Sequence, residues 1–151
     1  MSVPHRIAAG GIIIRNDAVL LVRYGTPDGG SFLVGPGGAL ESHENVFQAA
    51  VRETLEETGV VVLPRKVLFI EDLLCKRFKM CKIWVLCDAL DGQVRQTEGA
   101  RREGILEAGW FRREALTDTV VFPPPLLSHD WQAFASDDWQ VQCLTCREAA
   151  F

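Results

Sequence analysis

Three glutamates in a short segment have the residue type and spacing to bind a divalent cation. Glu53, Glu56 and Glu57 stand at i, i+3 and i+4, and side chains at that spacing emerge on one face of an α-helix. Hard oxygen ligands on a rigid helix suit Mg²⁺ or Mn²⁺, which bridge protein carboxylates to substrate phosphates. The pattern therefore predicts a metal site, with a solvated acidic helix face as the structural alternative.

A glycine-rich turn lies just before these acids. The sequence GPGG at 35–38 allows the backbone to approach a ligand closely. The acids fall in the later part of the expected helix, where the negative end of the helix dipole disfavours carboxylates. We therefore expect a compensating positive charge, and we expect Arg52 to pair with one of the acids and fix its orientation.

The segment from Asn45 to Thr58 is expected to form that helix. Ser42 is a suitable N-cap and Gly59 a suitable C-cap. The residues at helical spacing that predict its apolar stripe are Val46, Phe47, Ala50, Val51, Thr54 and Leu55. The three glutamates should lie on the face opposite this stripe.

Strands are expected on both sides of the helix. The segment 6–24 predicts a hairpin that turns at Asn16 and Asp17, and further strands are expected at 31–34, 60–63, 66–74, 78–90 and 105–111. The residues between 96 and 104 are interpreted as a loop. A short helix is expected near Arg112 and another from Pro125 to Ala135. Strands with helices between them indicate a mixed α/β class, and 151 residues fit a single domain, 1–151.

Composition narrows the class of partner and the compartment. The formal charge is −4 with scattered basic residues, so a surface for duplex nucleic acid is not expected. The N-terminus predicts neither a membrane span nor a signal peptide, so we expect a cytoplasmic protein without a membrane partner. Five cysteines cannot all pair internally, which favours a reducing compartment. Cys75, Cys81 and Cys87 are interpreted as small buried hydrophobes, and metal binding by Cys143 and Cys146 is left open.

The segment from Gly38 to Val60 resembles the signature of the Nudix hydrolase family, G-x5-E-x7-R-E-U-x-E-E-x-G-U, in which U is aliphatic. The fixed positions that match are Gly38, Glu44, Arg52, Glu53, Glu56, Glu57, Gly59 and Val60. Thr54 stands where the signature has an aliphatic residue, and its β-branched shape should affect packing more than chemistry. The resemblance implies the Nudix fold, an α/β/α sandwich around a mixed sheet, with this box at 38–60.

The resemblance also implies a role for each residue of the box. The metal ligands would be Glu53, Glu56, Glu57 and a carbonyl of the Gly37 to Gly38 turn. Glu44 would support the site by hydrogen bonding or through a metal-bound water, and Arg52 would orient a ligand carboxylate. The implied cofactor is Mg²⁺, with Mn²⁺ as an alternative.

Members of this family hydrolyse a diphosphate linkage in a nucleoside diphosphate joined to another group. A carboxylate must take the proton of the attacking water. Glu56 is one candidate, and the segment 96–111 supplies others in Glu98, Glu103 and Glu107. Arg23, which ends an expected strand, is expected to bind substrate phosphates, with a solvated strand-end arginine as the alternative.

Two functions are consistent with these residues. The first is a Mg²⁺-dependent diphosphohydrolase whose partner is a small nucleotide, either a nucleoside triphosphate or a nucleotide sugar. The second is a catalytically silent Nudix domain that binds a nucleotide or a protein for regulation. The retained box glutamates favour the enzyme. Assembly as a homodimer is left open.

Overall fold

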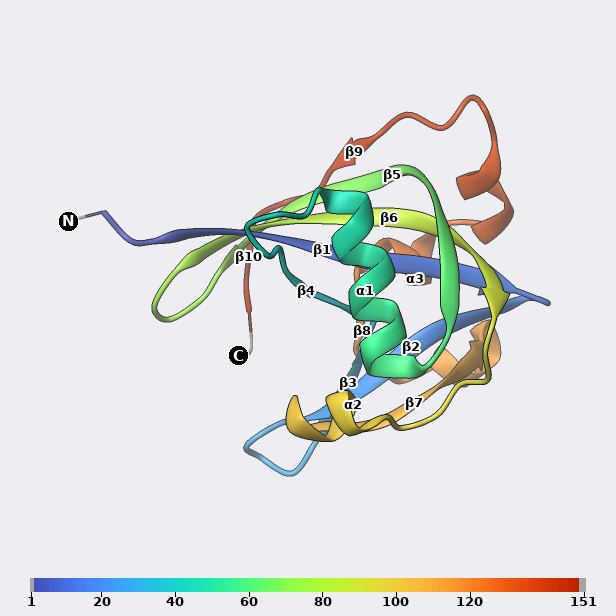
Figure 1. Ribbon diagram of the computed structural model, residues 1–151, viewed down its shortest axis with the longest axis horizontal. Helices are drawn as coiled ribbons and strands as arrows, with labels where there is room; N and C mark the ends of the chain where they lie inside the picture. The colour runs from blue at the N-terminus through green and yellow to red at the C-terminus, as the bar shows by residue number, and fades with distance from the viewer. Residues whose placement is uncertain (1, 150–151) are drawn as a thin grey trace.

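The computed structural model describes residues 2–149 and is built around one curled mixed sheet, shown with its helices in Figure 1. The strands are β1 (His5–Arg15), β2 (Ala18–Gly25), β3 (Ser31–Val34), β4 (Gly37–Ala39), β5 (Val61–Leu74), β6 (Lys79–Asp91), β7 (Ile105–Arg112), β8 (Val121–Phe122), β9 (Gln142–Cys143) and β10 (Arg147–Glu148). The helices are α1 (Val46–Thr58), α2 (Glu98–Arg102) and α3 (Pro125–Ser128), with 3-10 turns η1 (Arg113–Leu116) and η2 (Trp131–Ala135).

The sheet runs in the order β10-β5-β6-β1-β2-β3-β8, with β4 beside β1, β7 beside β2 and β9 beside β5. β1 is parallel to β6 and antiparallel to β4. The end of β1 turns back into β2 through Asn16 and Asp17, whose φ angles are 52° and 61°. The hairpin expected there is confirmed.

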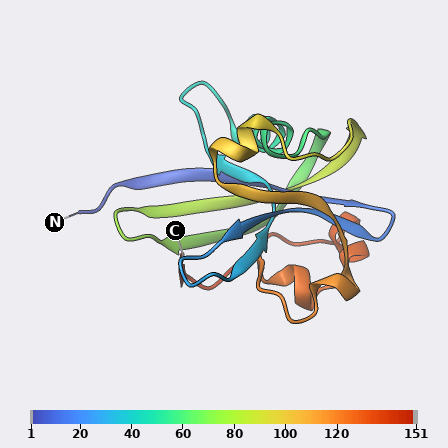
Figure 2. The same ribbon diagram turned by 90° about the horizontal axis from the view of Figure 1, so that it is seen from below.

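Helices cover the two faces of the sheet. Figure 2 shows α1 and the yellow α2 on one side, and the orange and red segments of η1, α3 and η2 on the other. This arrangement confirms the expected α/β class with a mixed sheet between helical layers. Among residues 2–149, no helix combines the length and apolar character needed to cross a membrane.

The central helix has the expected extent, but its N-cap differs from the expectation. Asn45, and not Ser42, caps α1: its side chain accepts a hydrogen bond from the Gln48 nitrogen at 2.8 Å, and the Gln48 side chain accepts one from the Asn45 nitrogen at 2.9 Å. This reciprocal pair satisfies two free backbone donors. At the other end, Gly59 adopts φ 78° and donates to the Leu55 carbonyl, as expected.

The buried face of α1 matches the predicted apolar stripe only in part. Ala50 and Thr54 are buried and Val46 and Val51 pack partly buried against the core, whereas Phe47 and Leu55 are exposed. The other buried residues of the helix are Ala49, Glu57 and Thr58. Helix α1 packs closely on β1, where a Cβ at Gly11 would lie 2.9 Å from the Thr54 hydroxyl. Small side chains are therefore required at this contact, and the large apolar ones lie outside it.

Three other segments differ from the sequence interpretation. The residues expected to form a loop after 96 contain α2, and the helix expected from Pro125 to Ala135 is divided into α3 and η2 at an extended His129. The two strands expected at 60–63 and 66–74 are one long strand, β5. Cys87 alone of the three interpreted as buried hydrophobes is fully buried, whereas Cys75 and Cys81 are half-buried.

Candidate active site

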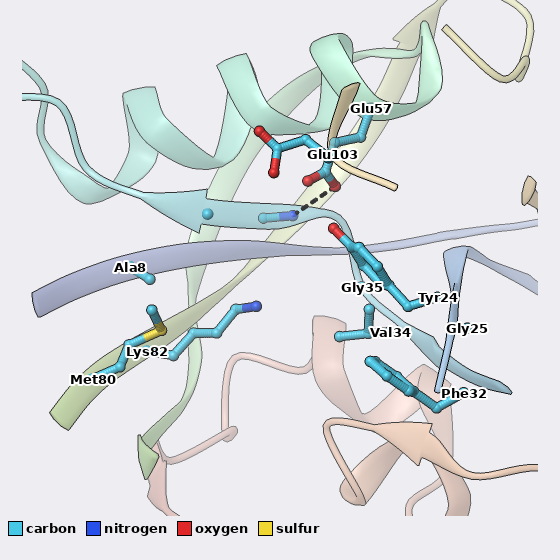
Figure 3. A pocket seen from close by; sticks show the side chains of 12 residues that line it. Ala8, Tyr24, Gly25, Phe32, Val34, Gly35, Glu57, Met80, Lys82 and Glu103 are labelled. Carbon is cyan, nitrogen blue, oxygen red and sulfur yellow. Dashed lines mark hydrogen bonds between the residues drawn. The ribbon is translucent and has the colours of Figure 1, made fainter. Parts of the chain in front are cut away.

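The glycine segment before α1 forms the short strand β4 and lies against the last turn of the helix. The Gly37 nitrogen donates a hydrogen bond of 3.1 Å to Glu57 Oε2, drawn as the dashed line in Figure 3. A Cβ at Gly38 would lie 2.6 Å from Glu53 Oε1. Neither glycine has positive φ, so this segment needs glycine for close approach and not for an unusual backbone conformation.

Glu57 and Glu53 are acidic side chains held inside the fold. Only 3% of Glu57 is exposed, and burial together with the nearby charge of Glu53 raises the pKa of Glu57 to about 8. Burial also raises the pKa of Glu53, although Arg52 opposes this shift. Within residues 2–149, Glu57 has no ion pair. The sequence placed Glu57 on a face opposite the core, and the structure corrects that placement.

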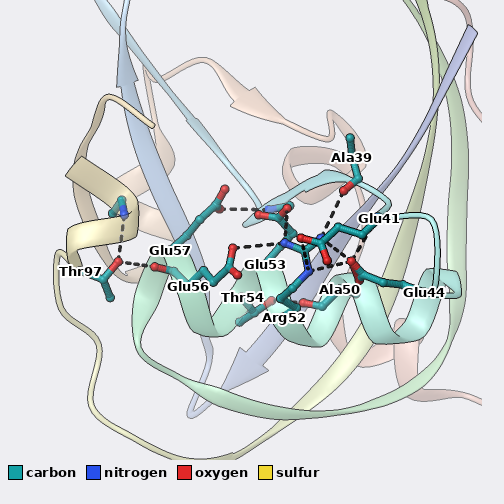
Figure 4. Close-up of polar contacts among 12 residues, drawn as sticks. Ala39, Glu41, Glu44, Ala50, Arg52, Glu53, Thr54, Glu56, Glu57 and Thr97 are labelled. Atoms are coloured by element: carbon teal, nitrogen blue, oxygen red, sulfur yellow. Dashed lines mark hydrogen bonds and ion pairs between the residues drawn. The ribbon is translucent and has the colours of Figure 1, made fainter. Parts of the chain in front are cut away.

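Arg52 lies among the other carboxylates of the box, as Figure 4 shows. It contacts Glu44 at 2.7 Å, Glu53 at 2.9 Å and Glu56 at 3.2 Å. It also donates to the Ala39 carbonyl at 3.3 Å, which ties α1 to β4. Arg52 therefore holds two acids of α1 and Glu44, which precedes the helix, in fixed positions.

Glu44 is held by Arg52 and has one free acceptor. Its Oε1 accepts from Arg52 Nε at 2.8 Å and from the Glu41 nitrogen at 3.2 Å. The hydrogen bond from Arg52 is the main cause of the lowered pKa of Glu44. Within the described chain, Oε2 is buried without a hydrogen-bond partner. This oxygen is available to accept from a water or a ligand.

The short helix α2 brings a further carboxylate to the site. Thr97 caps α2 by accepting from the Ala100 nitrogen at 2.9 Å, and its hydroxyl donates to the Glu56 carbonyl at the end of α1. Glu103 follows α2 directly, and its charge contributes to the raised pKa of both Glu53 and Glu57. The structure thus brings Glu103 next to the box.

A cavity of about 320 Å³ adjoins these carboxylates. Its lining residues come from β1, β2, β3, β4, α1, β6 and the end of α2, and are Ala8, Tyr24, Gly25, Phe32, Val34, Gly35, Gly37, Gly38, Glu57, Met80, Lys82 and Glu103. Figure 3 shows the acids on one side and the aromatic and aliphatic side chains on the other. The cavity is therefore charged at one end and largely apolar at the other.

The structure does not bring Arg23 to this cavity. Arg23 Nε is 2.8 Å from Glu107 Oε2, and Nη1 donates to the Ser31 hydroxyl at 3.1 Å. Both Arg23 and Glu107 lie outside the set of residues that line the cavity. A role for Arg23 in phosphate binding stays a prediction.

Glu98 also lies apart from the cavity, although it borders an acidic groove between α1 and α2 with Glu53, Glu56, Glu57 and Glu103. Its side chain is 81% exposed and lies 3.6 Å from Arg102. Of the acids considered as bases in 96–111, Glu103 is the one that lines both the groove and the cavity.

The residues at the site have the donor chemistry that a divalent cation requires. They supply carboxylate oxygens from Glu53, Glu56 and Glu57 and backbone carbonyls from β4, and hard cations bind such oxygens. Among residues 2–149, no three acidic, histidine or cysteine side chains are arranged to hold a metal ion, and Arg52 pairs with Glu53 and Glu56. Glu57 has no ion pair within residues 2–149 and lies beside Glu53, so a cation bound there would favour the ionised form of both acids.

Two residues of the cavity were missed by sequence reasoning. Tyr24 and Lys82 lie on β2 and β6, far from the box, and no motif includes them. Burial, and then the charges of Glu57, Glu103 and Glu53, raise the pKa of Tyr24, so its phenol stays protonated. The position of Lys82 within a run of apolar strand residues was a signal, since a lysine there requires a reason to be buried.

Comparisons with known proteins agree with this fold and this box. A model of the NUDIX domain matches residues 4–133, and the chain therefore belongs to the Nudix family. An ADP-ribose pyrophosphatase of Methanocaldococcus jannaschii is 31% identical over 98 residues, which cover 63% of this chain and 57% of that protein. The match thus spans little more than half the length of that relative.

Solved structures show the same fold. A NUDIX hydrolase from Nitrosomonas europaea superposes with a TM-score of 0.68 at 25% identity, covering 83% of this chain and 84% of that one. An ADP-ribose pyrophosphatase from Streptococcus suis gives a TM-score of 0.68 at 22% identity, covering 92% of this chain and 98% of that one. The Nudix fold that the box implied is confirmed.

Proposed function

We propose that this protein is a divalent-metal-dependent hydrolase of a diphosphate linkage in a nucleoside diphosphate joined to another group. The observation that carries the proposal is Glu57. It is a buried carboxylate, it lies beside Glu53, and it has no ion pair within residues 2–149. A fold that served only for stability would gain by replacing it, because a buried carboxyl beside another acid must either keep its proton well above its usual pKa or carry an unpaired charge, and both are costly.

The expected ligands of the cation are Glu53, Glu56, Glu57 and a carbonyl of the Gly37–Gly38 segment. A bound Mg²⁺ would neutralise phosphate charge and lower the pKa of a water molecule. The chain itself supplies the positions of these oxygens, since Arg52 and the Gly37 nitrogen hold the carboxylates in place. Fixed charges of this kind do not have to reorganise during the reaction.

The proton of the attacking water requires a nearby carboxylate that can accept it. Glu103 borders both the cavity and the acidic groove, and Glu56 lies at the mouth of the groove with an exposed side chain. Glu56 accepts a hydrogen bond from Arg52, so one of its oxygens is already occupied by a donor of the chain. These contacts favour Glu103 as the general base.

The substrate would place its diphosphate at the carboxylates and one arm in the cavity. A volume of about 320 Å³ lies at the small end of the range for ligand pockets, roughly 300–1,000 Å³, and holds one ring system. The similarity to an ADP-ribose pyrophosphatase supports a nucleotide sugar as the substrate class. Nucleoside triphosphates are the second class to test.

The test is a panel of nucleotide sugars, nucleoside triphosphates and dinucleoside polyphosphates incubated with the purified protein and Mg²⁺. We expect hydrolysis of at least one class, with products that locate the attacked phosphorus, and loss of turnover when a chelator removes the metal. Binding of nucleotides without hydrolysis of any panel member would instead favour the catalytically silent domain. Full turnover in excess chelator would contradict the metal-dependent mechanism.

A further inference from the structure

Lys82 is a buried lysine in the wall of the cavity. It lies on β6, is 8% exposed, and its Nζ is 4.3 Å from the centre of the Trp84 ring. Among the hydrogen bonds and ion pairs of residues 2–149, none involves its Nζ. Nζ is not among the fully buried polar atoms of the described chain that lack a partner, and Lys82 lines the cavity. The amine is therefore free to donate to a ligand in the cavity.

The acids nearest to Lys82 already have other donors. Glu71, its partner across the strand pair, accepts from Trp84 Nε1 at 3.0 Å and from Arg147 Nη2 at 3.3 Å. Glu57 accepts from the Gly37 nitrogen. Burial lowers the pKa of Lys82, whereas the charges of Glu57 and Glu71 oppose this shift and favour the ammonium. Figure 3 shows the amine end of Lys82 directed into the cavity.

The cavity lining that lies away from the acids suits a flat ring. Tyr24 and Phe32 form a stacked pair, with ring centroids 5.6 Å apart and an interplanar angle of 20°. Met80 adds a polarisable thioether, which packs well against aromatic groups. A sugar in this place would leave most of its hydroxyls without partners. A heteroaromatic base needs few polar contacts at its edge and fits this lining.

We propose that Lys82 selects the nucleobase of the substrate by donating a hydrogen bond to an oxo group at the ring edge. Uracil, hypoxanthine and guanine carry such an oxygen, whereas cytosine and adenine carry an amino group in that place. A lysine ammonium has only donors, so an amino group would direct its N–H toward the N–H of Lys82. The inference rests on the proposed function for the identification of the ligand as a nucleotide.

The test compares ligands that differ only in this group. Affinities of inosine and adenosine monophosphate, and of uridine and cytidine monophosphate, are measured by calorimetry with the wild-type protein. We expect the oxo member of each pair to bind about 10- to 100-fold tighter, the range for a hydrogen bond to a charged group. Equal affinity within both pairs would overturn the inference without any variant.

The variant Lys82→Met removes the donor and keeps the length and the apolar packing of the side chain. We expect the ratio within each pair to fall to about 1, while a cooperative melting transition shows that the variant is folded. An undiminished oxo preference in a folded Lys82→Met protein would also overturn the inference, since the selection would then come from another group.

Hydrolysis of matched substrates separates this inference from the proposed function. The pair is inosine and adenosine diphosphate ribose, which differ only at the base. Hydrolysis of both at equal kcat/KM would support the proposed function and overturn the inference. Selective binding of the oxo nucleotides without any hydrolysis would support the role of Lys82 and contradict the proposed enzyme.

Discussion

Glu57 Oε2 accepts a hydrogen bond from the Gly37 nitrogen at 3.1 Å, and this contact joins the last turn of α1 to strand β4. It holds a buried carboxylate at the border between the acidic groove and the cavity. Because Gly37 and Gly38 have no side chains, the acids of α1 can lie directly against the backbone of β4. The acids of the site thus lie at the contact between helix α1 and strand β4.

The substitution Glu57→Gln keeps the size of this side chain and its hydrogen bond to Gly37 while it removes the charge. We expect turnover of the preferred substrate to fall by at least ~100-fold, as for the loss of one major electrostatic contributor. Steady-state kinetics of the variant would measure this loss.

The matched control for that experiment is Glu114→Gln, an exposed glutamate on η1 that lies outside the residues lining the cavity and the acidic groove. It should change turnover by less than a few fold. Glu41 is a poorer control, because its carboxylate is 3.9 Å from Arg52. Near-normal turnover in Glu57→Gln would show that the site does not depend on this charge.

The stability of the metal-free protein should depend on pH through Glu57. Its pKa is about 8 in the folded protein and about 4.3 in an unfolded chain. Between these values the folded state binds more protons, so the free energy of unfolding should decrease as the pH rises toward 8 and then level off. The total change is at most on the order of 5 kcal/mol.

Chemical denaturation of wild type and Glu57→Gln at several pH values would measure this dependence. The difference between the two proteins isolates Glu57 from the other titrating groups. We expect the variant to gain stability relative to wild type as the pH rises. A difference that does not change with pH would mean that Glu57 titrates at its ordinary pKa.

The two glycines of β4 should respond differently to alanine. A Cβ at Gly38 would meet the Glu53 carboxylate at 2.6 Å, whereas a Cβ at Gly37 would meet the Gly10 Cα at 2.7 Å. We expect Gly38→Ala to displace the Glu53 side chain, which can turn more easily than backbone can move, and to reduce activity with little loss of stability. Gly37→Ala should disturb β1 and cost about 1–3 kcal/mol of stability, as overpacking does.

Melting temperature and turnover, measured together on both glycine variants, would test this difference. Gly38→Ala serves as the control for Gly37→Ala, because both add one methyl group to the same strand. Equal effects of the two variants on stability would show that Glu53 is fixed as firmly as the backbone, which would contradict the account.

The acids around α2 provide a further prediction. Glu103 lines the cavity and the groove, and Glu98 is exposed and lies near Arg102. We expect Glu103→Gln to reduce kcat by about 10²–10⁴-fold, as for the loss of a general base, and Glu98→Gln to have little effect. Rates measured across pH would separate the loss of a base from a loss of binding. A larger fall in kcat in Glu98→Gln than in Glu103→Gln would identify Glu98 as the base.

Much of the fold could be predicted from local signals in the sequence. The turn at Asn16 and Asp17, the strand at 31–34 and the helix cap at Gly59 all follow from residues that favour those conformations, and the structure confirms them. Helix α2 was missed, although Thr97 has the preferred type for an N-cap and Gly104 adopts φ 79° after its end. A five-residue helix is too short to show periodicity.

The buried face of α1 could be predicted from hydrophobic periodicity only in part. Periodicity ranks residues by polarity, whereas the contact with β1 selects by size, so Thr54 and the alanines lie inside and Phe47 lies outside. The buried hydroxyl of Thr54 is satisfied by the Ala50 carbonyl at 2.7 Å. The lining of the cavity could not be predicted either, because Tyr24 and Lys82 lie near the box only as a result of pairing between strands that are distant in the sequence.

Metal binding by wild type and Glu57→Gln tests whether a divalent cation binds the carboxylates of α1. Thermal unfolding is followed while Mg²⁺ or Mn²⁺ is titrated into metal-free protein. A cation that binds the folded state raises the melting temperature by mass action. We expect the melting temperature of wild type to rise with metal concentration, and we expect this rise to be largely lost in Glu57→Gln. Equal rises in both proteins, or none in wild type, would contradict the assignment of the cation to the carboxylates of α1.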